Sequence, residues 1–189
     1  MTSPLEFLAA RGSTPSRLLT DPGPSPEQLN DLLQMGLRVP DHGRLEPWRY
    51  VLIERERGAQ LGERLAQLLL AKDPHATPAA IDKERGRFQR APMTITVVSS
   101  PCLGHKVPQC EQQLSAGCVA MMLILGAEAA GFGAQWLTGW PTYDRQVMDW
   151  LGLTTDESII GFVYVGTPGA ARPHRPRPQL PSKLSYYGN

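Results

Sequence analysis

The sequence lacks most of the motifs that assign a function at sight. Its 189 residues contain no GxSxG elbow, no Walker A loop, no GxGxxG fingerprint and no HExxH helix. Aromatic residues make up only 7% of the chain, and 19 Lys and Arg against 18 Asp and Glu leave a net charge of +1. This balance gives no bulk reason to expect a nucleic-acid or anionic-membrane partner.

Cysteine is also scarce, with only Cys102, Cys110 and Cys118. The first residues, MTSPLEFLAARGS, have no basic region followed by a long apolar stretch, so they do not resemble a secretory signal. An odd cysteine count without such a signal predicts reduced, buried or incidental thiols in a cytoplasmic protein. Cys102, His105 and Cys110 have some zinc-ligand character, but no second close pair completes a tetrahedral set, so we expect no metal site.

Long apolar runs are absent as well. The most apolar stretch, LSAGCVAMMLILGA at residues 114–127, is short for a bilayer span and is followed at once by Glu128. We expect instead a core helix over about residues 111–130, apolar nearly all round and therefore covered on all sides. A second subunit is one way to supply part of that cover.

The remaining pattern mixes helices and strands without regular β-α alternation, which predicts a single α+β domain over residues 1–189. Helical spacing and capping residues predict helices over residues 4–10, 25–37, 57–70, 79–88 and 143–151. Apolar, β-branched runs predict strands over residues 48–53, 92–99, 133–137 and 158–165. The tail over residues 167–189 contains five prolines, so we expect it to run extended over a surface, either its own or a partner's.

Two polar segments are candidates for ligand binding. Arg11 and Ser13 flank a flexible Gly12, and an Arg with a nearby hydroxyl can converge on one phosphate; the alternative is a surface Arg at a helix end. The loop over residues 38–48 joins a helix to a strand, where ligands commonly bind, and Arg38 and His42 could donate to a planar, oxygen-rich ligand. The alternatives are an Arg38 that interacts with the helix dipole and a His42 satisfied within its loop.

A third candidate is the glycine-punctuated stretch over residues 131–139, GFGAQWLTG. Glycines beside a strand let the backbone approach a flat ligand closely, although a tight turn into a strand has the same composition. Asp41 and His42 do not indicate a hydrolytic triad, because neighbours in sequence usually point apart and no nucleophile stands nearby.

Together, in their order and approximate spacing, these three segments resemble the FMN-dependent nitroreductases. The resemblance covers nearly the whole chain and extends to features of the family's minimal, short-chain subgroup. Those features are residues 105–108 (HKVP), Glu111-Gln112, residues 115–118 (SAGC), Gly161-Phe162 and residues 166–168 (GTP).

The resemblance implies an α+β fold with a central, mostly antiparallel sheet flanked by helices, built as an intertwined homodimer with FMN at each of two subunit interfaces. It implies an oxidoreductase in which NAD(P)H reduces FMN and a small nitroaromatic or quinone-like oxidant then takes the electrons by ping-pong hydride transfer through flavin N5. The cofactor carries this chemistry, so no catalytic side chain is expected. The implied FMN-binding residues are Arg11, Gly12, Ser13, Arg38, His42, Trp136, Leu137 and Thr138. The implied NAD(P)-binding residues are Gly126, Ala127, Glu128, Ala129, Ala130 and Gly131.

The chain departs from the family pattern at three places, and three rival functions are possible. At residues 41–44 it has Asp-His-Gly-Arg, where larger relatives have Ser-Ser-x-Asn. Many relatives have a second Arg where this chain has Gly12, which predicts weaker phosphate binding, and the common Gln before Pro-Trp is Glu46. The same residues fit a non-enzymatic FMN-binding or scaffold protein, or a flavin-dependent dehydrogenase or dehalogenase of the same fold. The basic run at residues 172–177 (RPHRPR) would suit nucleic acid, but no aromatic residues interleave it for base stacking.

Overall fold

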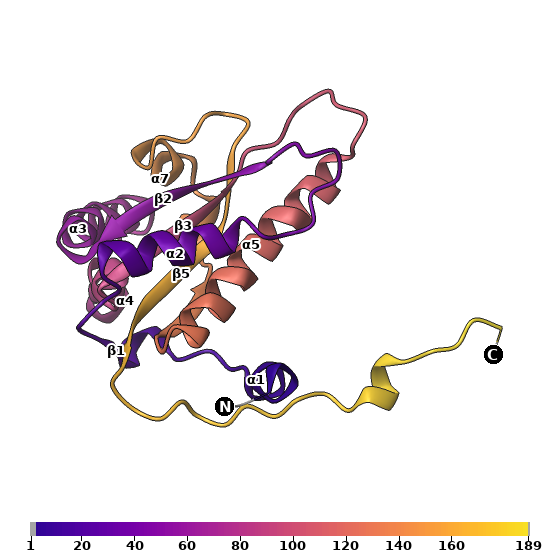
Figure 1. Ribbon diagram of the computed structural model, residues 1–189. Helices are drawn as coiled ribbons and strands as arrows, with labels where there is room; N and C mark the ends of the chain where they lie inside the picture. Colours follow the sequence, from indigo (N-terminus) through magenta and orange to yellow (C-terminus); the bar gives the residue numbers. More distant parts are fainter. Residues whose placement is uncertain (1–2, 189) are drawn as a thin grey trace.

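An antiparallel sheet forms the centre of the chain, which the computed structural model describes over residues 3–188 (Figure 1). The long strand β5 (Ser158–Pro168) pairs with β3 (Met93–Ser99), and β3 pairs in turn with β2 (Trp48–Glu54). Strand β4 (Gly133–Leu137) pairs with β5 over Phe162 to Gly166, and the short β1 (Leu19–Thr20) pairs with the end of β5. All of these pairings are antiparallel, as the resemblance implied.

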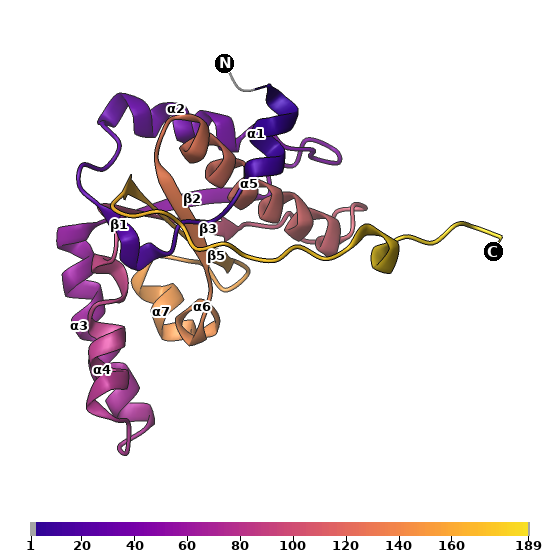
Figure 2. The same cartoon turned by 90° about the horizontal axis from the view of Figure 1, so that it is seen from below.

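Helices cover both faces of the sheet (Figure 2). Helices α2 (Pro26–Gly36) and α5 (Gln109–Ala129) pack on one face, over a core that includes Leu32, Val119 and Leu123. Helix α3 (Arg55–Lys72) lies on the other face with α7 (Arg145–Trp150), over a core that includes Leu65, Phe88 and Val147. The remaining helical segments are α1 (Pro4–Ala10), α4 (Pro78–Arg85), α6 (Trp140–Tyr143), and the 3-10 turns η1 (Ser16–Leu18), η2 (Arg87–Gln89) and η3 (Leu180–Lys183). The predicted α+β class is confirmed.

Local sequence explains several helix boundaries. The Ser25 hydroxyl accepts from the Gln28 backbone N–H at 3.2 Å, and the Gln28 side chain accepts from the Ser25 N–H at 2.9 Å, which forms a capping box before Pro26. The predicted helix over residues 143–151 is wrong in one respect, because the chain breaks it at Asp144. That residue is extended and its carboxylate accepts from the Val147 N–H, so it ends α6 and caps α7.

Helix α5 is the core helix, and within residues 3–188 the chain covers only part of its surface, so the predicted cover on all sides would need a second subunit. By length and composition alone α5 could cross a membrane, yet one of its faces is buried against the sheet and α2. On its other face Leu114 is 71% exposed and Cys118 is also exposed, with Met121 half-buried. An apolar helix face of this kind requires a cover that this single chain does not supply.

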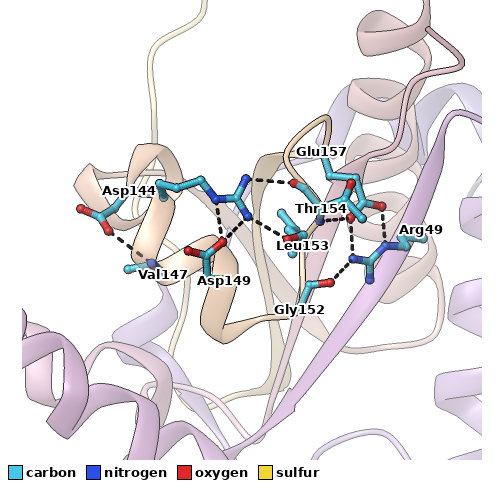
Figure 3. Close-up of polar contacts among 9 residues, drawn as sticks. Arg49, Asp144, Val147, Asp149, Gly152, Leu153, Thr154 and Glu157 are labelled. Atoms are coloured by element: carbon cyan, nitrogen blue, oxygen red, sulfur yellow. Dashed lines mark hydrogen bonds and ion pairs between the residues drawn. The ribbon is translucent and has the colours of Figure 1, made fainter.

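An ion pair secures the side of the sheet formed by β2 (Figure 3). Arg49 donates from Nε and Nη2 to the two carboxylate oxygens of Glu157 at 2.6 and 2.7 Å, and Nη2 also donates to the Gly152 carbonyl at 3.0 Å. The hydrogen bonds from Arg49 lower the pKa of Glu157 from 4.5 to about 2. The Thr154 N–H donates to the same carboxylate at 3.0 Å, so the pair fixes the loop that leads into β5.

The tail after β5 leaves the body of the molecule. It passes beside α1 and then extends away from the sheet in both views (Figures 1 and 2). Its outer part exposes Leu180, Leu184 and Tyr187. Residues 169–179 contain neither helix nor strand, and a single 3-10 turn, η3, follows further on.

Candidate anion and cofactor site

A pocket of about 640 Å³ lies where the tail crosses the N-terminal segment. Its walls are residues 9–13, Pro15, Gln135, residues 172–175 and Arg177. The lining includes four arginines and one histidine, and it contains no aspartate or glutamate. A concave site with this charge is suited to an anion, and planar guanidinium groups are matched in geometry to phosphate oxygens.

Two tail arginines tie the loop after α1 in place. Arg172 donates from Nη1 to the Gly12 carbonyl at 3.1 Å and from Nη2 to the Ala10 carbonyl. Arg177 donates from Nη2 to the Arg11 carbonyl at 2.7 Å. Three successive carbonyls thus accept hydrogen bonds from the tail, and the shape of the pocket depends on them.

Glu128 anchors Arg172 from the opposite side. Its Oε1 accepts from Arg172 Nη1 at 2.6 Å, while its Oε2 is buried without a hydrogen-bond partner. The carboxylate thus holds the guanidinium at the rim of the pocket and neutralises part of its charge. This contact links the last turn of α5 to the tail.

The position of Arg172 explains the glycine at residue 12. A Cβ placed on Gly12 would lie 2.9 Å from Nε and 3.0 Å from Cζ of Arg172, so this guanidinium occupies the space beside the Gly12 backbone. The tail thus places a guanidinium beside the position where the resemblance implies a second Arg. The weaker phosphate binding expected from Gly12 therefore stays a prediction, and Arg172 opposes it.

The first and third predicted segments lie side by side. The Thr14 N–H donates to the Ala134 carbonyl at 3.0 Å, and the Ser16 N–H donates to Gln135 Oε1 at 2.6 Å. Gln135 lines the pocket, and residues 136–138 continue β4 away from it. A ligand with its anionic end at residues 11–13 can therefore extend along β4.

Trp136 itself packs into the sheet. Its Nε1 donates to the Ile160 carbonyl at 3.3 Å, and its ring lies directly on Gly161, where a Cβ would come within 1.9 Å of Nε1. Gly161 is therefore required for this side chain to lie flat on the sheet. With the Trp136 side chain held there, the backbone of residues 136–138 is fixed.

The second predicted segment lies elsewhere on the chain. Arg38 is exposed just after α2, and His42 Nδ1 lies 2.8 Å from Glu111 Oε2 in the first turn of α5. The Asp41 carboxylate accepts from the Leu45 and Glu46 N–H groups at 3.2 and 2.9 Å and so orders this loop. His42 is thus satisfied by a glutamate, and within this chain it is not brought to the pocket.

Helix α5 separates the two parts of the predicted site. Glu111, which contacts His42, and Glu128, which contacts Arg172, are 17 residues apart on one continuous helix. At 1.5 Å per residue the two glutamates are about 26 Å apart along the helix axis. Within this chain, His42 and the pocket at Arg11 therefore lie near opposite ends of α5.

The segment predicted for NAD(P) mostly serves packing and anchoring. Gly126 and Ala127 are buried, and a Cβ on Gly126 would lie 3.3 Å from Met35 and 3.4 Å from Leu32 of α2. Glu128 is engaged by Arg172, while Ala129, Ala130 and Gly131 are exposed at the helix end. Helix packing accounts for the two buried small residues, and a role in NAD(P) binding stays a prediction.

The contribution of the tail and of Gln135 to this pocket was not predicted from the sequence. The tail was expected on its own surface or a partner's, and its arginines had no predicted role in cofactor binding; Arg172, Arg175 and Arg177 line the pocket with the N-terminal segment. The sequence did contain a signal for a shared anion site: the proline-rich tail carries a cluster of arginines, and the N-terminal Arg-Gly-Ser segment suits a phosphate. That signal does not say where the tail lies.

The sequence predicted reduced thiols that are either buried or incidental, and the structure contradicts the first alternative. Cys102, Cys110 and Cys118 are all free and exposed. Within residues 3–188, no group of three or more His, Cys, Asp or Glu is arranged to hold a metal ion.

Comparisons with known proteins define the class to which this fold and pocket belong. The nitroreductase family model matches residues 8–167. YdjA of Escherichia coli strain K12, whose name gives NAD(P)H nitroreductase as its proposed activity, is 41% identical over 164 residues, which is 87% of each chain. A Haemophilus influenzae protein with the same proposed activity in its name is 33% identical over 165 residues, covering 86% of this chain and 87% of that one.

Solved structures show the same fold. A nitroreductase-like protein from Bacillus cereus superposes with a TM-score of 0.82 at 21% identity, covering 100% of this chain and 98% of that one. A Bacteroides fragilis nitroreductase crystallised with bound FMN has a TM-score of 0.72 at 20% identity, with 92% and 94% of the two chains covered. This chain belongs to the nitroreductase family.

Proposed function

We propose that this protein is an FMN-dependent NAD(P)H oxidoreductase that reduces small nitroaromatic or quinone-like oxidants. The observation that carries the proposal is the arginine-lined pocket at residues 11–13, which opens beside β4 in a chain of the nitroreductase family. The family relationship gives the reaction class, and the pocket provides a place for the cofactor's phosphate.

The residues present fit a phosphate group. Arg11 and the Ser13 hydroxyl line the pocket from one side, and Arg172 and Arg175 line it from the tail. A phosphate monoester carries close to two negative charges at neutral pH, and no carboxylate in the lining opposes it. Charged hydrogen bonds to Arg are among the strongest that proteins make.

The flavin ring would lie farther along β4. Residues 136–138 start at the edge of the pocket beyond Gln135, and a strand advances about 3.3 Å per residue, so Thr138 lies about 10 Å from Gln135. In this position the backbone of Trp136, Leu137 and Thr138 would face the ring near N5. FMN, when bound, supplies the hydride chemistry by which NAD(P)H and then the oxidant react in turn, and the chain orients it.

The proposed assembly is a homodimer with two composite sites. His42 and the pocket of its own chain lie near opposite ends of α5, so Arg38 and His42 would contact the FMN bound by a second copy. The exposed apolar face of α5, with Leu114 and Cys118, would be covered in the same assembly. The single-domain organisation over residues 1–189 and the roles of the eight predicted FMN residues are part of this proposal.

The exposed thiols suit the proposed cytoplasmic location. Three free cysteines at the surface persist where the surroundings are reducing.

The test is anaerobic reduction of the FMN-loaded protein in a stopped-flow spectrometer. Mixing with NADH or NADPH should bleach the flavin absorbance within seconds, and subsequent addition of a nitroaromatic or a quinone should restore it. A protein that binds FMN but is bleached by neither nucleotide would be a non-enzymatic FMN-binding protein or a dehydrogenase with another reductant. That result would refute the proposed reaction while leaving cofactor binding intact.

A further inference from the structure

A buried ion pair lies beneath the turn that follows β4. Arg87 of η2 and Glu84 of α4 are only 4% and 3% exposed. Arg87 donates from Nε and Nη2 to the two carboxylate oxygens of Glu84 at 2.6 and 2.7 Å, which is a bidentate pair. Neither residue lines the anion pocket, and the proposed function assigns them no role.

Helix α3 fixes the backbone on either side of Arg87. A Cβ on Gly62 would lie 2.0 Å from the Arg85 carbonyl oxygen, and a Cβ on Gly58 would lie 2.4 Å from that of Phe88. Only glycines allow this direct packing of the α4–η2 backbone on α3. The backbone of Arg87, between these two contacts, therefore has little freedom to move.

Aromatic residues of the core pack against the 3-10 turn η2, which carries Arg87. The Phe88 ring packs edge-on against Phe162 of β5, with ring centroids 4.9 Å apart, and the Tyr164 ring stacks on its other side at 6.4 Å. The Tyr164 hydroxyl is buried without a hydrogen-bond partner. These aromatic surroundings are poorly screened by water, so an unbalanced charge on the pair would be felt at longer range than one on the surface.

The guanidinium of Arg87 lies beside Gly139, on the side where a Cβ would project. A Cβ on Gly139 would lie 3.2 Å from Nη1 and 3.3 Å from Nη2, and the residue has φ 150°, a conformation that favours glycine. Gly139 directly follows Thr138, the last of the three residues proposed to face the flavin. The charged group is therefore one residue from the backbone that would contact the ring.

We propose that Arg87, held by Glu84, is a positioning residue that fixes the Thr138–Gly139 turn against the flavin. This inference rests on the proposed function, because it needs FMN beside β4. The intact pair is neutral overall and adds little net charge at the ring. Removing the Glu84 charge leaves a buried cation, because arginine does not lose its proton in proteins. Removing Arg87 instead leaves a carboxyl group that can take up a proton and become neutral.

The experiment is the midpoint potential of the bound FMN, measured in the holoprotein by reductive titration with a reference dye. Glu84→Gln should shift the potential to a more positive value, because the stranded cation favours the more negative, reduced state of the ring. The double variant Glu84→Gln with Arg87→Met removes the stranded cation, so it should reverse the part of the shift that is due to charge and keep the part that is due to the lost Arg87–Gly139 contact. The potential is read from FMN bound to folded protein, so a loss of folded protein alone would lower the amount of bound FMN and leave its potential unchanged.

The matched control is Glu157→Gln. It removes a carboxylate charge that is as secluded as that of Glu84, with side chains 7% and 5% exposed, but it leaves an Arg49 that is 37% exposed and still donates to the Gly152 carbonyl. Strand β2, which carries Arg49, is separated from β4 by β3 and β5, a distance of about 14 Å at the usual strand spacing. The control should leave the potential unchanged.

A second variant covers the case in which Glu84→Gln does not fold. Gly139→Ala should change the potential and visible spectrum of bound FMN with the ion pair intact. Gly152→Ala, at another glycine with positive φ but with nothing within 4 Å of its Cβ, should not. If the unmodified protein binds no FMN, the proposed function fails. If it binds FMN and neither Glu84→Gln nor Gly139→Ala shifts the potential more than its control does, only the role of Arg87 is refuted.

Discussion

The tail arginine Arg172 offers the sharpest test of the proposed pocket. Replacing it with Ala removes a cation from the lining and three hydrogen bonds to the loop and to Glu128. Hydrogen bonds to charged groups contribute about 1.5–3 kcal/mol each to binding or stability. We expect a loss at the upper end, about 3 kcal/mol, or roughly a hundredfold increase in the Kd for FMN.

The expected loss of binding energy is at the upper end of this range because removal of Arg172 leaves the Glu128 carboxylate without its partner. Glu128 is 20% exposed in its side chain and already has one buried, unpartnered oxygen, so without Arg172 its negative charge would face the incoming phosphate. The double variant Arg172→Ala with Glu128→Gln should therefore recover part of the lost affinity, about 1 kcal/mol. This recovery separates charge at the pocket from a general loss of structure.

Quenching of FMN fluorescence on titration with the apoprotein measures these affinities. Arg17→Ala is the matched control, because Arg17 is exposed, lies close in sequence and does not line the pocket. A Kd for Arg172→Ala within a factor of about two of the control would show that the pocket at residues 11–13 does not hold the phosphate, and the argument from its charge would be refuted.

Three further predictions follow from the site, the assembly and the ion pair of β2. Arg11→Ala should weaken FMN binding by about 1.5–3 kcal/mol in the same titration; unchanged affinity would remove Arg11 from the site. Leu114→Glu should convert the dimer into single chains, as measured by light scattering, and should lower the affinity for FMN. The control Leu70→Glu, at an exposed leucine of α3, should do neither. A Leu114→Glu protein that stays dimeric would place the interface elsewhere. Glu157 has a pKa lowered from 4.5 to about 2, so its ionised form contributes stability above pH 4.5 that is lost as the pH falls toward 2. The lost stability is at most about 3 kcal/mol. The Glu157→Gln variant should therefore be less stable to urea than the unmodified protein near neutral pH, and its free energy of unfolding should fall less between pH 4.5 and 2. Parallel pH profiles of the two proteins would contradict this.

Local signals predicted the elements well where a few neighbouring residues decide the structure. Ser25, Pro26 and Gln28 form a complete capping box, and the start of α2 follows from it. The run of β-branched residues in β3 has every member buried, as a central strand between two partners requires. The break at Asp144 was available from the same rules, because Asp is a strong N-cap residue, but continuous helical spacing obscured it.

The site was less accessible because its parts meet through long-range contacts. The pairing of residues 14–16 with residues 134–135 of β4 joins segments more than a hundred residues apart, and no local pattern encodes it. Prolines indicated that the tail is extended, but its position depends on the contacts of Arg172 with Gly12 and Glu128. The resemblance implied residues 11–13 and 136–138 together. Only the structure shows that the segments that carry them meet through residues 14–16 and 134–135, and that His42 contacts the other end of α5.

Direct measurement of cofactor binding tests the central claim. Purified protein should show the visible absorbance of bound flavin, or should acquire it after incubation with excess FMN and keep it through desalting, with close to one FMN per chain. Protein that stays colourless after this treatment, while folded by circular dichroism, would contradict the assignment of the arginine-lined pocket and of β4 to FMN.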